Sequence, residues 1–317
     1  MNALRLAKDI MATKLVVTAP DDDVFDGAQA LLRNRITGMP VVAPDRAFLG
    51  MLSERCCLRA LTPAMSEARS AGAAPAAVPA REFMAAGVFT LRPEMDSLEA
   101  IALLLRHRFS GAPVVDAAGD FLGVFSERYS MRLLVNAAYE SVPSIEVGAL
   151  MNTDRGRLID EDADLLAIAR MFLDSYYRRL PVLRDRRLVG QVSRRDVLRA
   201  AERAAHDLRA GAPGQPGAAA APRSARVADY METDVQTIDE ETDFLTIAQV
   251  FLESNRRRLP VLRDGRLVGQ VSRRDLLAAV LAMLGAEHHT EQVALYLSAV
   301  MEPNSRPLLN RADYGRG

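Results

Sequence analysis

Hydrophobic and polar positions follow two different spacings along this chain, and residues 157–204 show both clearly. RLI (157–159) is a short apolar run that predicts a strand, and Asp164 has the position of a helix N-cap. Apolar residues then recur at the spacing of one helix face: Leu165, Ile168, Ala169, Phe172 and Leu173. This stretch therefore predicts a short strand followed by an amphipathic helix.

Two runs rich in valine and leucine follow the predicted helix. PVLRD (181–185) and LVGQVS (188–193) predict two short strands joined as a hairpin. A second helical pattern begins directly afterwards, with Ser193 or a neighbour as its N-cap; its apolar residues are Val197, Leu198 and Ala201. The segment as a whole predicts the order β-α-β-β-α within about sixty residues.

The same pattern recurs elsewhere in the chain. Residues 159–200 and 238–279 are identical at 30 of 42 positions at an offset of 79, and both contain the heptapeptide GQVSRRD. In the first half, LLRNRITGMPVVAPDRAFLGMLSERCCLRAL (31–61) matches LLRHRFSGAPVVDAAGDFLGVFSERYSMRLL (104–134) at an offset of 73. The chain therefore contains four copies of one unit, in two subtypes.

Segments rich in alanine, glycine and proline separate the copies, and we expect them to be flexible linkers. The expected organisation is unit 1 (1–62), a linker (63–80), unit 2 (81–140), unit 3 (144–204), a linker (205–225), unit 4 (226–286) and a tail (287–317). A unit of this size buries too little surface to be stable alone. We therefore expect each unit to pair with its neighbour, 1 with 2 and 3 with 4.

The composition is that of a globular protein, with 49% hydrophobic residues, 26% charged residues and a formal net charge of −1. This charge balance gives no global attraction to nucleic acid or to an anionic membrane. Cys56 and Cys57 are adjacent and provide no disulfide framework. The longest apolar run (276–286) is shorter than the ~20 residues of a membrane helix, and the start of the chain lacks a signal-peptide pattern. We expect a cytoplasmic protein without a membrane span.

The four copies resemble the CBS domain, which is named after cystathionine β-synthase. The resemblance rests on the Pro-Val-hydrophobic triplets at 40–42, 113–115, 181–183 and 260–262, and on the Gly-x-x-Ser strands at 50–53, 123–126, 190–193 and 269–272. It implies an α/β (α+β) fold in which four β-α-β-β-α units pair into two pseudo-two-fold Bateman modules. It also implies clefts between units that bind adenosine ligands such as AMP, ADP, ATP or S-adenosylmethionine.

The ligand motif of that family is Gly-h-h-Ser/Thr-x-x-Asp, where h is hydrophobic, the hydroxyl contacts phosphate and the Asp binds the ribose hydroxyls. Units 3 and 4 match the motif in full and add arginines suited to phosphate oxygens. The expected nucleotide-binding residues are Ser193, Arg194, Arg195 and Asp196 in unit 3, and Ser272, Arg273, Arg274 and Asp275 in unit 4. The start of the following helix also favours an anion. Base contacts are expected from the first-strand region, at Thr153, Thr233 and Val235.

Units 1 and 2 depart from the motif at two positions each. Cys56 and Tyr129 stand in place of the Asp, and Glu54 and Glu127 stand in place of the first Arg. Loss of the carboxylate removes the ribose contact, and a glutamate repels a phosphate. We therefore expect units 1 and 2 to have lost nucleotide binding or to bind another ligand, and to serve in packing or partner contact.

Arginine is concentrated around the two complete motifs. Residues 178–199 contain eight arginines against two aspartates, a net +6, and residues 256–275 contain seven against two, a net +5. An anionic ligand would explain this concentration. Two structural explanations stay open: a solvated face or protected sheet edge for the arginines, and a duplicated strand end with a helix cap for GQVSRRD.

The sequence thus predicts a non-catalytic regulatory sensor that binds an adenine nucleotide between units 3 and 4 and acts on an effector protein in trans. The alternative is a nucleotide-independent scaffold for dimerisation or docking, and the oligomeric state, including a homodimer, stays open. Nucleic-acid binding is less favoured, because aromatic residues form only 5% of the chain and do not alternate with the arginines. We expect no cofactor and no metal; the pair His288–His289 lacks further ligands at metal-binding spacing.

Overall fold

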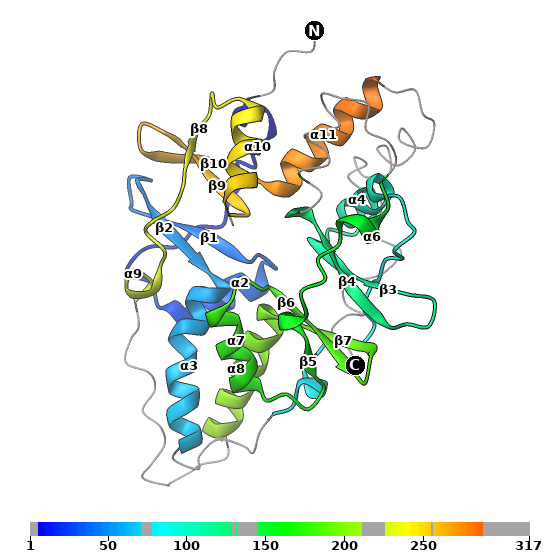
Figure 1. Cartoon of the computed structure of the whole chain (residues 1–317). Coiled ribbons are helices and arrows are strands. Elements are labelled where there is room, and N and C mark those ends of the chain that lie inside the picture. Colours follow the sequence, from blue (N-terminus) through cyan, green and yellow to red (C-terminus); the bar gives the residue numbers. More distant parts are fainter. Residues whose placement is uncertain are drawn as a thin grey trace.

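The computed structural model describes residues 6–70, 78–128, 131, 145–210, 226–254 and 256–287, which form four similar units (Figure 1). Tyr129 and the pair His288–His289 lie outside the described residues. Every unit contains a helix followed by an antiparallel pair of strands, and in units 1, 3 and 4 a long helix follows that pair. The predicted order β-α-β-β-α is confirmed in units 3 and 4, whereas in units 1 and 2 a single parallel bridge, Thr18–Val41 or Leu91–Val114, stands in place of the first strand.

Unit 1 comprises α1 (Ala7–Ile10), α2 (Val24–Arg33), β1 (Gly38–Val42), β2 (Phe48–Ser53) and α3 (Glu54–Ser70). Unit 2 comprises η1 (Ala80–Glu82), α4 (Ser97–Arg106), β3 (Gly111–Val115) and β4 (Phe121–Ser126). Unit 3 comprises α6 (Val147–Leu150), η2 (Arg155–Arg157), β5 (Ile159–Asp160), α7 (Leu165–Asp174), β6 (Arg179–Arg184), β7 (Arg187–Ser193) and α8 (Arg194–Ala210). Unit 4 comprises α9 (Val227–Tyr230), β8 (Ile238–Asp239), α10 (Phe244–Glu253), β9 (Arg258–Arg263), β10 (Arg266–Ser272) and α11 (Arg273–Glu287). Helices α3 and α8 thus continue into the segments predicted to be linkers.

An aspartate begins the first long helix of every unit. The side chains of these N-cap residues accept a hydrogen bond from the backbone N–H two residues further on; they are Asp23, Asp96, Asp164 and Asp243. Such caps satisfy N–H groups that have no partner within the helix. The predicted apolar face of α7 is buried, because Leu165, Ile168, Ala169 and Phe172 are each at most 4% exposed.

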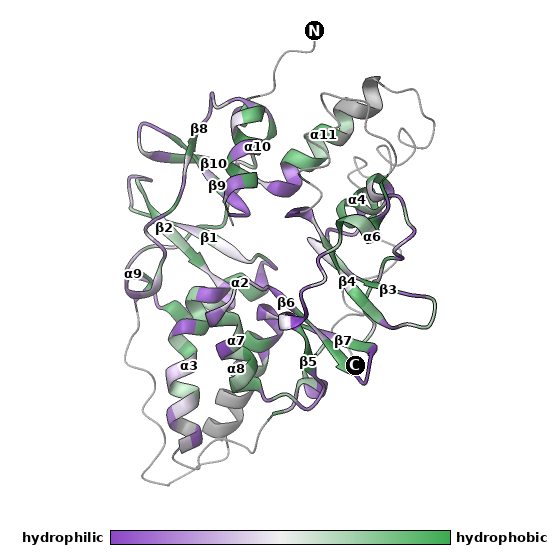
Figure 2. Ribbon diagram, in the orientation of Figure 1, coloured by the Kyte–Doolittle hydropathy of each residue, from purple (hydrophilic) through white to green (hydrophobic). Residues whose placement is uncertain are grey.

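The strands form small sheets. Strands β1 and β2, β3 and β4, β6 and β7, and β9 and β10 pair antiparallel, while β5 and β8 join β6 and β9 in parallel. The hairpin turns of units 3 and 4 require left-handed backbone, which Asp185 (φ 58°), Asp264 (φ 50°) and Gly265 (φ 73°) adopt. Strands β2, β4 and β7 are mostly apolar (Figure 2), and each contributes a buried residue to one of the hydrophobic cores that it shares with the helices.

The amino-terminal segment of each unit lies on a different unit. Ala12 exchanges two backbone hydrogen bonds with Gln270 (2.9 and 3.0 Å), which places the start of unit 1 on β10 of unit 4. Glu232 and Met51 exchange two more (both 2.9 Å), so the start of unit 4 lies on β2 of unit 1. The corresponding pairs between units 2 and 3 are Ala85–Gln191 and Asn152–Val124.

The modules therefore pair unit 1 with unit 4 and unit 2 with unit 3. The prediction that units 3 and 4 form one module is wrong, because no backbone bridge joins these two units among the described residues. The reason is that all four units carry the same local pattern, so the pattern does not encode which copies exchange segments. Because of this exchange, the strand that carries Gly-x-x-Ser in each unit (β2, β4, β7 or β10) lies beside the amino-terminal segment of the partner unit.

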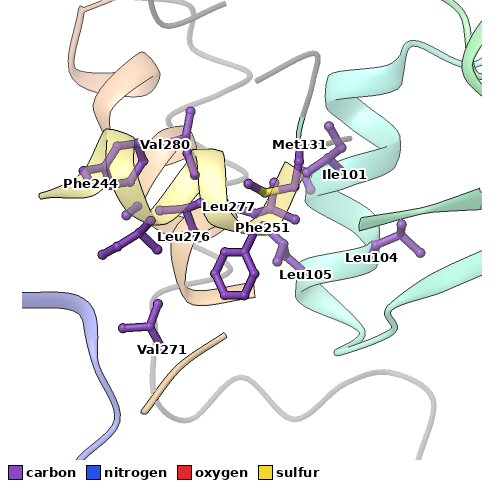
Figure 3. Packing of buried hydrophobic residues seen from close by; sticks show 14 of the residues in the cluster. Ile101, Leu104, Leu105, Met131, Phe244, Phe251, Val271, Leu276, Leu277 and Val280 are labelled. Carbon is purple, nitrogen blue, oxygen red and sulfur yellow. The ribbon is translucent and has the colours of Figure 1, made fainter. Parts of the chain in front are cut away.

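Two hydrophobic cores lie between helices of different modules, one between units 1 and 3 and the other between units 2 and 4. In one core, α3 of unit 1 packs against α7 and α8 of unit 3; in the other, α4 of unit 2 packs against α11 of unit 4 (Figure 3). Each exchanged segment contributes one fully buried small residue to these cores: Ala7, Ala80, Val147 and Val227. Every unit thus contacts one neighbour through its exchanged segment and another through its helices.

Candidate functional site

The Ser and Asp residues of the two complete motifs cap the helices that follow them. The Asp196 carboxylate accepts hydrogen bonds from the backbone N–H (2.8 Å) and the hydroxyl (2.5 Å) of Ser193, whose Oγ accepts in turn from the Asp196 N–H (3.3 Å). Ser272 and Asp275 repeat this capping box at 2.8, 2.6 and 3.3 Å. Only Oδ2 of each aspartate takes part, so Oδ1 keeps its capacity to accept. Burial raises the pKa of the Asp275 carboxyl.

The first arginine of each motif is buried and turned back onto its own unit. Arg194 is 9% exposed and donates to the carbonyls of Phe172 (3.2 Å) and Ser175 (3.3 Å) at the end of α7. Arg273, at 5% exposed, does the same at the end of α10, where its acceptors are the carbonyls of Phe251 (2.9 Å) and Ser254 (2.8 Å). A cation at a helix carboxyl end is favourable. Burial lowers the pKa of both guanidinium groups to about 10.

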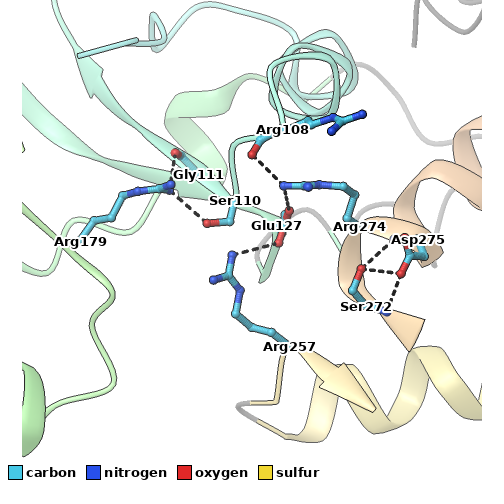
Figure 4. A network of polar contacts seen from close by, with 9 residues as sticks. All are labelled: Arg108, Ser110, Gly111, Glu127, Arg179, Arg257, Ser272, Arg274 and Asp275. Carbon is cyan, nitrogen blue, oxygen red and sulfur yellow. Dashed lines mark hydrogen bonds and ion pairs between the residues drawn. The ribbon is translucent and has the colours of Figure 1, made fainter. Parts of the chain in front are cut away.

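The second arginine of each motif contacts a glutamate of another unit. Arg195 Nε lies 3.4 Å from Glu54 Oε1 of unit 1. Arg274 lies 3.9 Å from Glu127 Oε1 of unit 2, and Arg257 lies 3.6 Å from Glu127 Oε2 (Figure 4). The glutamates that replace the first Arg of the motif in units 1 and 2 are therefore ion-pair partners for the arginines of units 3 and 4.

Two further pairs of arginines, Arg178–Arg179 and Arg257–Arg258, lie at the start of β6 and β9. Arg179 donates to the Ser110 hydroxyl (3.1 Å) and the Gly111 carbonyl (3.3 Å) of unit 2, as Figure 4 shows. Arg258 donates to the Gly38 carbonyl of unit 1 (3.2 Å). Burial lowers the pKa of Arg178 well below its ordinary value, and the guanidinium groups of neighbouring arginines, Arg257 foremost, lower it further. The arginines of units 3 and 4 thus meet near the centre of the molecule.

We name this group the central arginine cluster; it comprises Arg178, Arg179, Arg194, Arg195, Arg257, Arg258, Arg273 and Arg274. The carboxylates that face it are Glu54, Glu127, Asp196 and Asp275. Counted over these twelve side chains alone, eight arginines against four carboxylates leave an excess of four positive charges. Charges taken out of water are stable only with compensation, so the cluster is suited to an anion.

The residues predicted to contact the base do not join the two complete motifs. Thr233 and Val235 follow Glu232, which lies on β2 of unit 1, beside the motif that has Cys56 in place of the Asp. Thr153 follows Asn152, which lies on β4 of unit 2. The exchange carries each of these segments to another unit, beside an incomplete motif, and their contact with a base stays a prediction.

The segments that do lie beside the complete motifs come from units 1 and 2. Met11–Thr13 pairs antiparallel with β10 at Gln270, and Met84–Ala86 pairs antiparallel with β7 at Gln191, so the two segments run from the Ser end of each strand towards Gly269 and Gly190. Sequence reasoning missed Thr13, although Met-x-Thr stands at the same place in units 1, 3 and 4 (11–13, 151–153 and 231–233). Unit 2 has Ala86 at this position.

The glycines of the motifs are explained by this close approach of backbone. A Cβ atom at Gly269 would collide with the Met11 side chain, and one at Gly190 with Met84. A Cβ at Gly50 would lie 2.5 Å from the Glu232 carbonyl oxygen. Gly50 therefore needs glycine to seat the exchanged backbone, whereas at Gly190 and Gly269 a Cβ would displace a methionine side chain.

In unit 1 the capping position of the aspartate is taken by a thiol. The Ser53 hydroxyl lies 3.1 Å from Cys56 Sγ, and both cysteines are free and buried. Burial raises the pKa of the Cys57 thiol. Among the described residues no cluster of three or more His, Cys, Asp or Glu side chains is placed to hold a metal, and no helix is long and apolar enough to span a bilayer.

Comparison with known proteins agrees with this architecture. The sequence profile of the CBS domain matches residues 7–63, 80–129, 147–203 and 227–282, which is more than half of the chain. The chain belongs to the CBS domain family. Its four CBS units pair as two Bateman modules, which confirms the predicted fold class.

Proteins similar to this chain differ in how much of it they cover. Protein MJ1225 of Methanocaldococcus jannaschii is 27% identical over 205 residues (63% of this chain, 69% of MJ1225), and its crystal structure, aligned over 87% of this chain and 99% of that one, has a TM-score of 0.40. A 33.4 kDa protein from a ribosomal RNA operon of Thermofilum pendens is 25% identical over 279 residues (86% and 90%). CBSX2 of Arabidopsis thaliana, solved with AMP, is 26% identical and covers 39% of this chain and 96% of its own, with a TM-score of 0.35.

Proposed function

We propose that the chain is a non-catalytic regulatory sensor that binds an adenine nucleotide (AMP, ADP or ATP) and signals to an effector protein in trans. The observation that carries the proposal is the central arginine cluster at the starts of α8, α11, β6 and β9, whose eight arginines outnumber the four carboxylates that face them. A nucleotide phosphate would compensate this charge with charge-assisted hydrogen bonds. The free, buried cysteines favour the cytoplasm as the compartment.

The exchange of segments changes where the nucleotide would lie. The sequence indicated a site between units 3 and 4, but the complete motif of unit 4 faces the start of unit 1, and that of unit 3 faces the start of unit 2. We therefore place one ligand between units 1 and 4 and one between units 2 and 3. Their phosphates would point to the central arginine cluster, which both sites share.

Each motif residue has a stated role in this proposal. Oδ1 of Asp196 and of Asp275 would accept from the ribose hydroxyls while Oδ2 continues to cap the helix. Arg195 and Arg274 would bind phosphate oxygens, whereas Arg194 and Arg273 are engaged by carbonyls and would act through charge. Thr13 replaces Thr233 as the candidate for base contact in the unit 1–unit 4 site.

A thermal-shift panel of AMP, ADP, ATP and S-adenosylmethionine tests the proposal. A ligand at one hundred times its Kd stabilises the folded state by about 2.7 kcal/mol, which is readily measured as a rise in Tm. The matched variants are Asp196→Asn and Asp275→Asn, in which the amide oxygen keeps the cap but the charge that holds the ribose is lost. We expect the double variant to keep its fold and to lose most of the nucleotide-dependent rise.

Two other outcomes would support the alternatives instead. If none of the four ligands raises the Tm, the chain is better explained as a scaffold for dimerisation or docking. If the arginines bind nucleic acid, the affinity for an oligonucleotide should fall steeply with salt concentration. S-adenosylmethionine, which lacks phosphate, should bind without help from the central arginine cluster.

A further inference from the structure

Two buried glutamates face the central arginine cluster from the units that lack the motif aspartate. Glu54 is 7% exposed and Glu127 is 5% exposed, and each begins the helical segment that follows the Ser of its unit. They occupy the position that Arg194 and Arg273 occupy in units 3 and 4. An ionised carboxylate at this depth requires a positive partner, and the cluster supplies several.

The ion pairs that these glutamates form are incomplete. Their N–O distances of 3.4, 3.6 and 3.9 Å exceed the 2.7–2.9 Å usual for a charge-assisted hydrogen bond. Oε1 of both glutamates and Nε of Arg195 and Arg274 are buried without a hydrogen-bond partner among the described residues. The glutamates therefore supply negative charge to the arginines but leave hydrogen-bonding capacity unused, which a phosphate oxygen would satisfy.

We propose that Glu54 and Glu127 are internal competitors of the ligand: they engage Arg195 and Arg274 in the empty protein, and a phosphate takes these arginines over. This inference rests on the proposed function, because it concerns the same site. The entering phosphate meets two like charges at close range, which lowers its affinity. Units 1 and 2, which lack a complete motif of their own, thereby set the ligand concentration to which units 3 and 4 respond.

Neutral replacements of the same shape test this role. Isothermal titration calorimetry would compare the wild type with Glu54→Gln, Glu127→Gln and the double variant, using whichever of AMP, ADP and ATP raises the wild-type Tm most. Coupling between interacting sites is commonly 5- to 150-fold, so we expect each single substitution to lower Kd by about tenfold. Because Glu54 faces the unit 3 motif and Glu127 the unit 4 motif, each should tighten one of two binding events.

Glu67→Gln is the matched control, since Glu67 is exposed on the same helix as Glu54 and its substitution removes the same charge. The Kd of Glu67→Gln for the nucleotide should equal that of the wild type. If Glu67→Gln lowers the Kd as much as Glu54→Gln and Glu127→Gln do, the effect comes from net charge and the proposal is overturned. Unchanged or weaker binding in Glu54→Gln and Glu127→Gln, while the wild type binds, would overturn it and leave the proposed function intact. If neither the wild type nor the double variant binds AMP, ADP or ATP, both ideas fail. Binding by the double variant alone would support the competitor role in its strongest form.

Discussion

Replacement of Gly50 by alanine is the sharpest test of the exchange between units 1 and 4. The new Cβ would lie 2.5 Å from the Glu232 carbonyl oxygen, whereas ordinary carbon–oxygen contacts lie near 3.3–3.6 Å. The exchanged segment would have to move by roughly 0.8 Å, which would strain both hydrogen bonds between Met51 and Glu232. Overpacking costs about 1–3 kcal/mol and a weakened hydrogen bond about 1 kcal/mol, against a gain of about 0.4–1 kcal/mol from Gly→Ala in the unfolded chain. We expect a net loss of about 2–3 kcal/mol in the free energy of unfolding, measured by urea titration.

Gly87→Ala is the control for this experiment, because a Cβ at Gly87 meets nothing within 4 Å. It should change the free energy of unfolding by less than about 1 kcal/mol, in the stabilising direction. If Gly50→Ala costs no more than Gly87→Ala, the segment that contains Glu232 does not lie on β2, and the pairing of units 1 and 4 is refuted.

Three further predictions follow from the same structure. Asp196→Ala should lower the free energy of unfolding by about 1–2 kcal/mol through loss of the capping box, and Asp196→Asn by less than half of that in the same urea titration; equal losses would argue against the cap. Cysteines at Ala12 and Gln270, in a chain in which the two native cysteines are serine, should form a disulfide visible on a non-reducing gel; a chain that stays reduced under oxidant would contradict the exchange. Burial raises the pKa of the Glu54 carboxyl above its ordinary 4.5, so the folded protein binds the carboxyl proton more tightly than the unfolded chain does. The stability that this protonated carboxyl contributes is present below pH 4.5 and is lost as pH rises through the pKa of the folded state. The stability of the wild type relative to Glu54→Gln should therefore fall from pH 4.5 upwards, and a difference that is constant with pH would refute this.

Local features of the fold follow from local sequence. Asp164 caps α7 as its position indicates, and the turn at Asp185 lies between the two predicted strands. The pattern also places the N-cap of α8 at Ser193 or a neighbour, because a Ser at a strand end before an apolar helix is a common start signal, and the structure shows that it is Ser193. Each of these features depends on residues fewer than ten positions apart, so the pattern of one segment is sufficient to predict it.

Features that depend on contacts between copies were not predictable in this way. The choice of partner depends on backbone approach at positions such as Gly50 and Gly269, and every unit has a glycine there. The role of Glu54 was interpreted only as repulsion of a phosphate, because its partner Arg195 lies 141 positions away. Thr13 was missed for the same reason, since its segment acts on a unit that begins more than 200 residues later.

The reciprocal exchange also determines the order in which the chain can complete its structure during synthesis. Units 2 and 3 are adjacent in sequence, so their exchange is complete once β7 and α8 have left the ribosome. Unit 1 must wait, because Val227, which fills its core, belongs to the last unit, and its own Ala7 has no place until unit 4 exists. We therefore expect unit 1 (residues 1–62) to depend on chaperone protection until unit 4 has been synthesised.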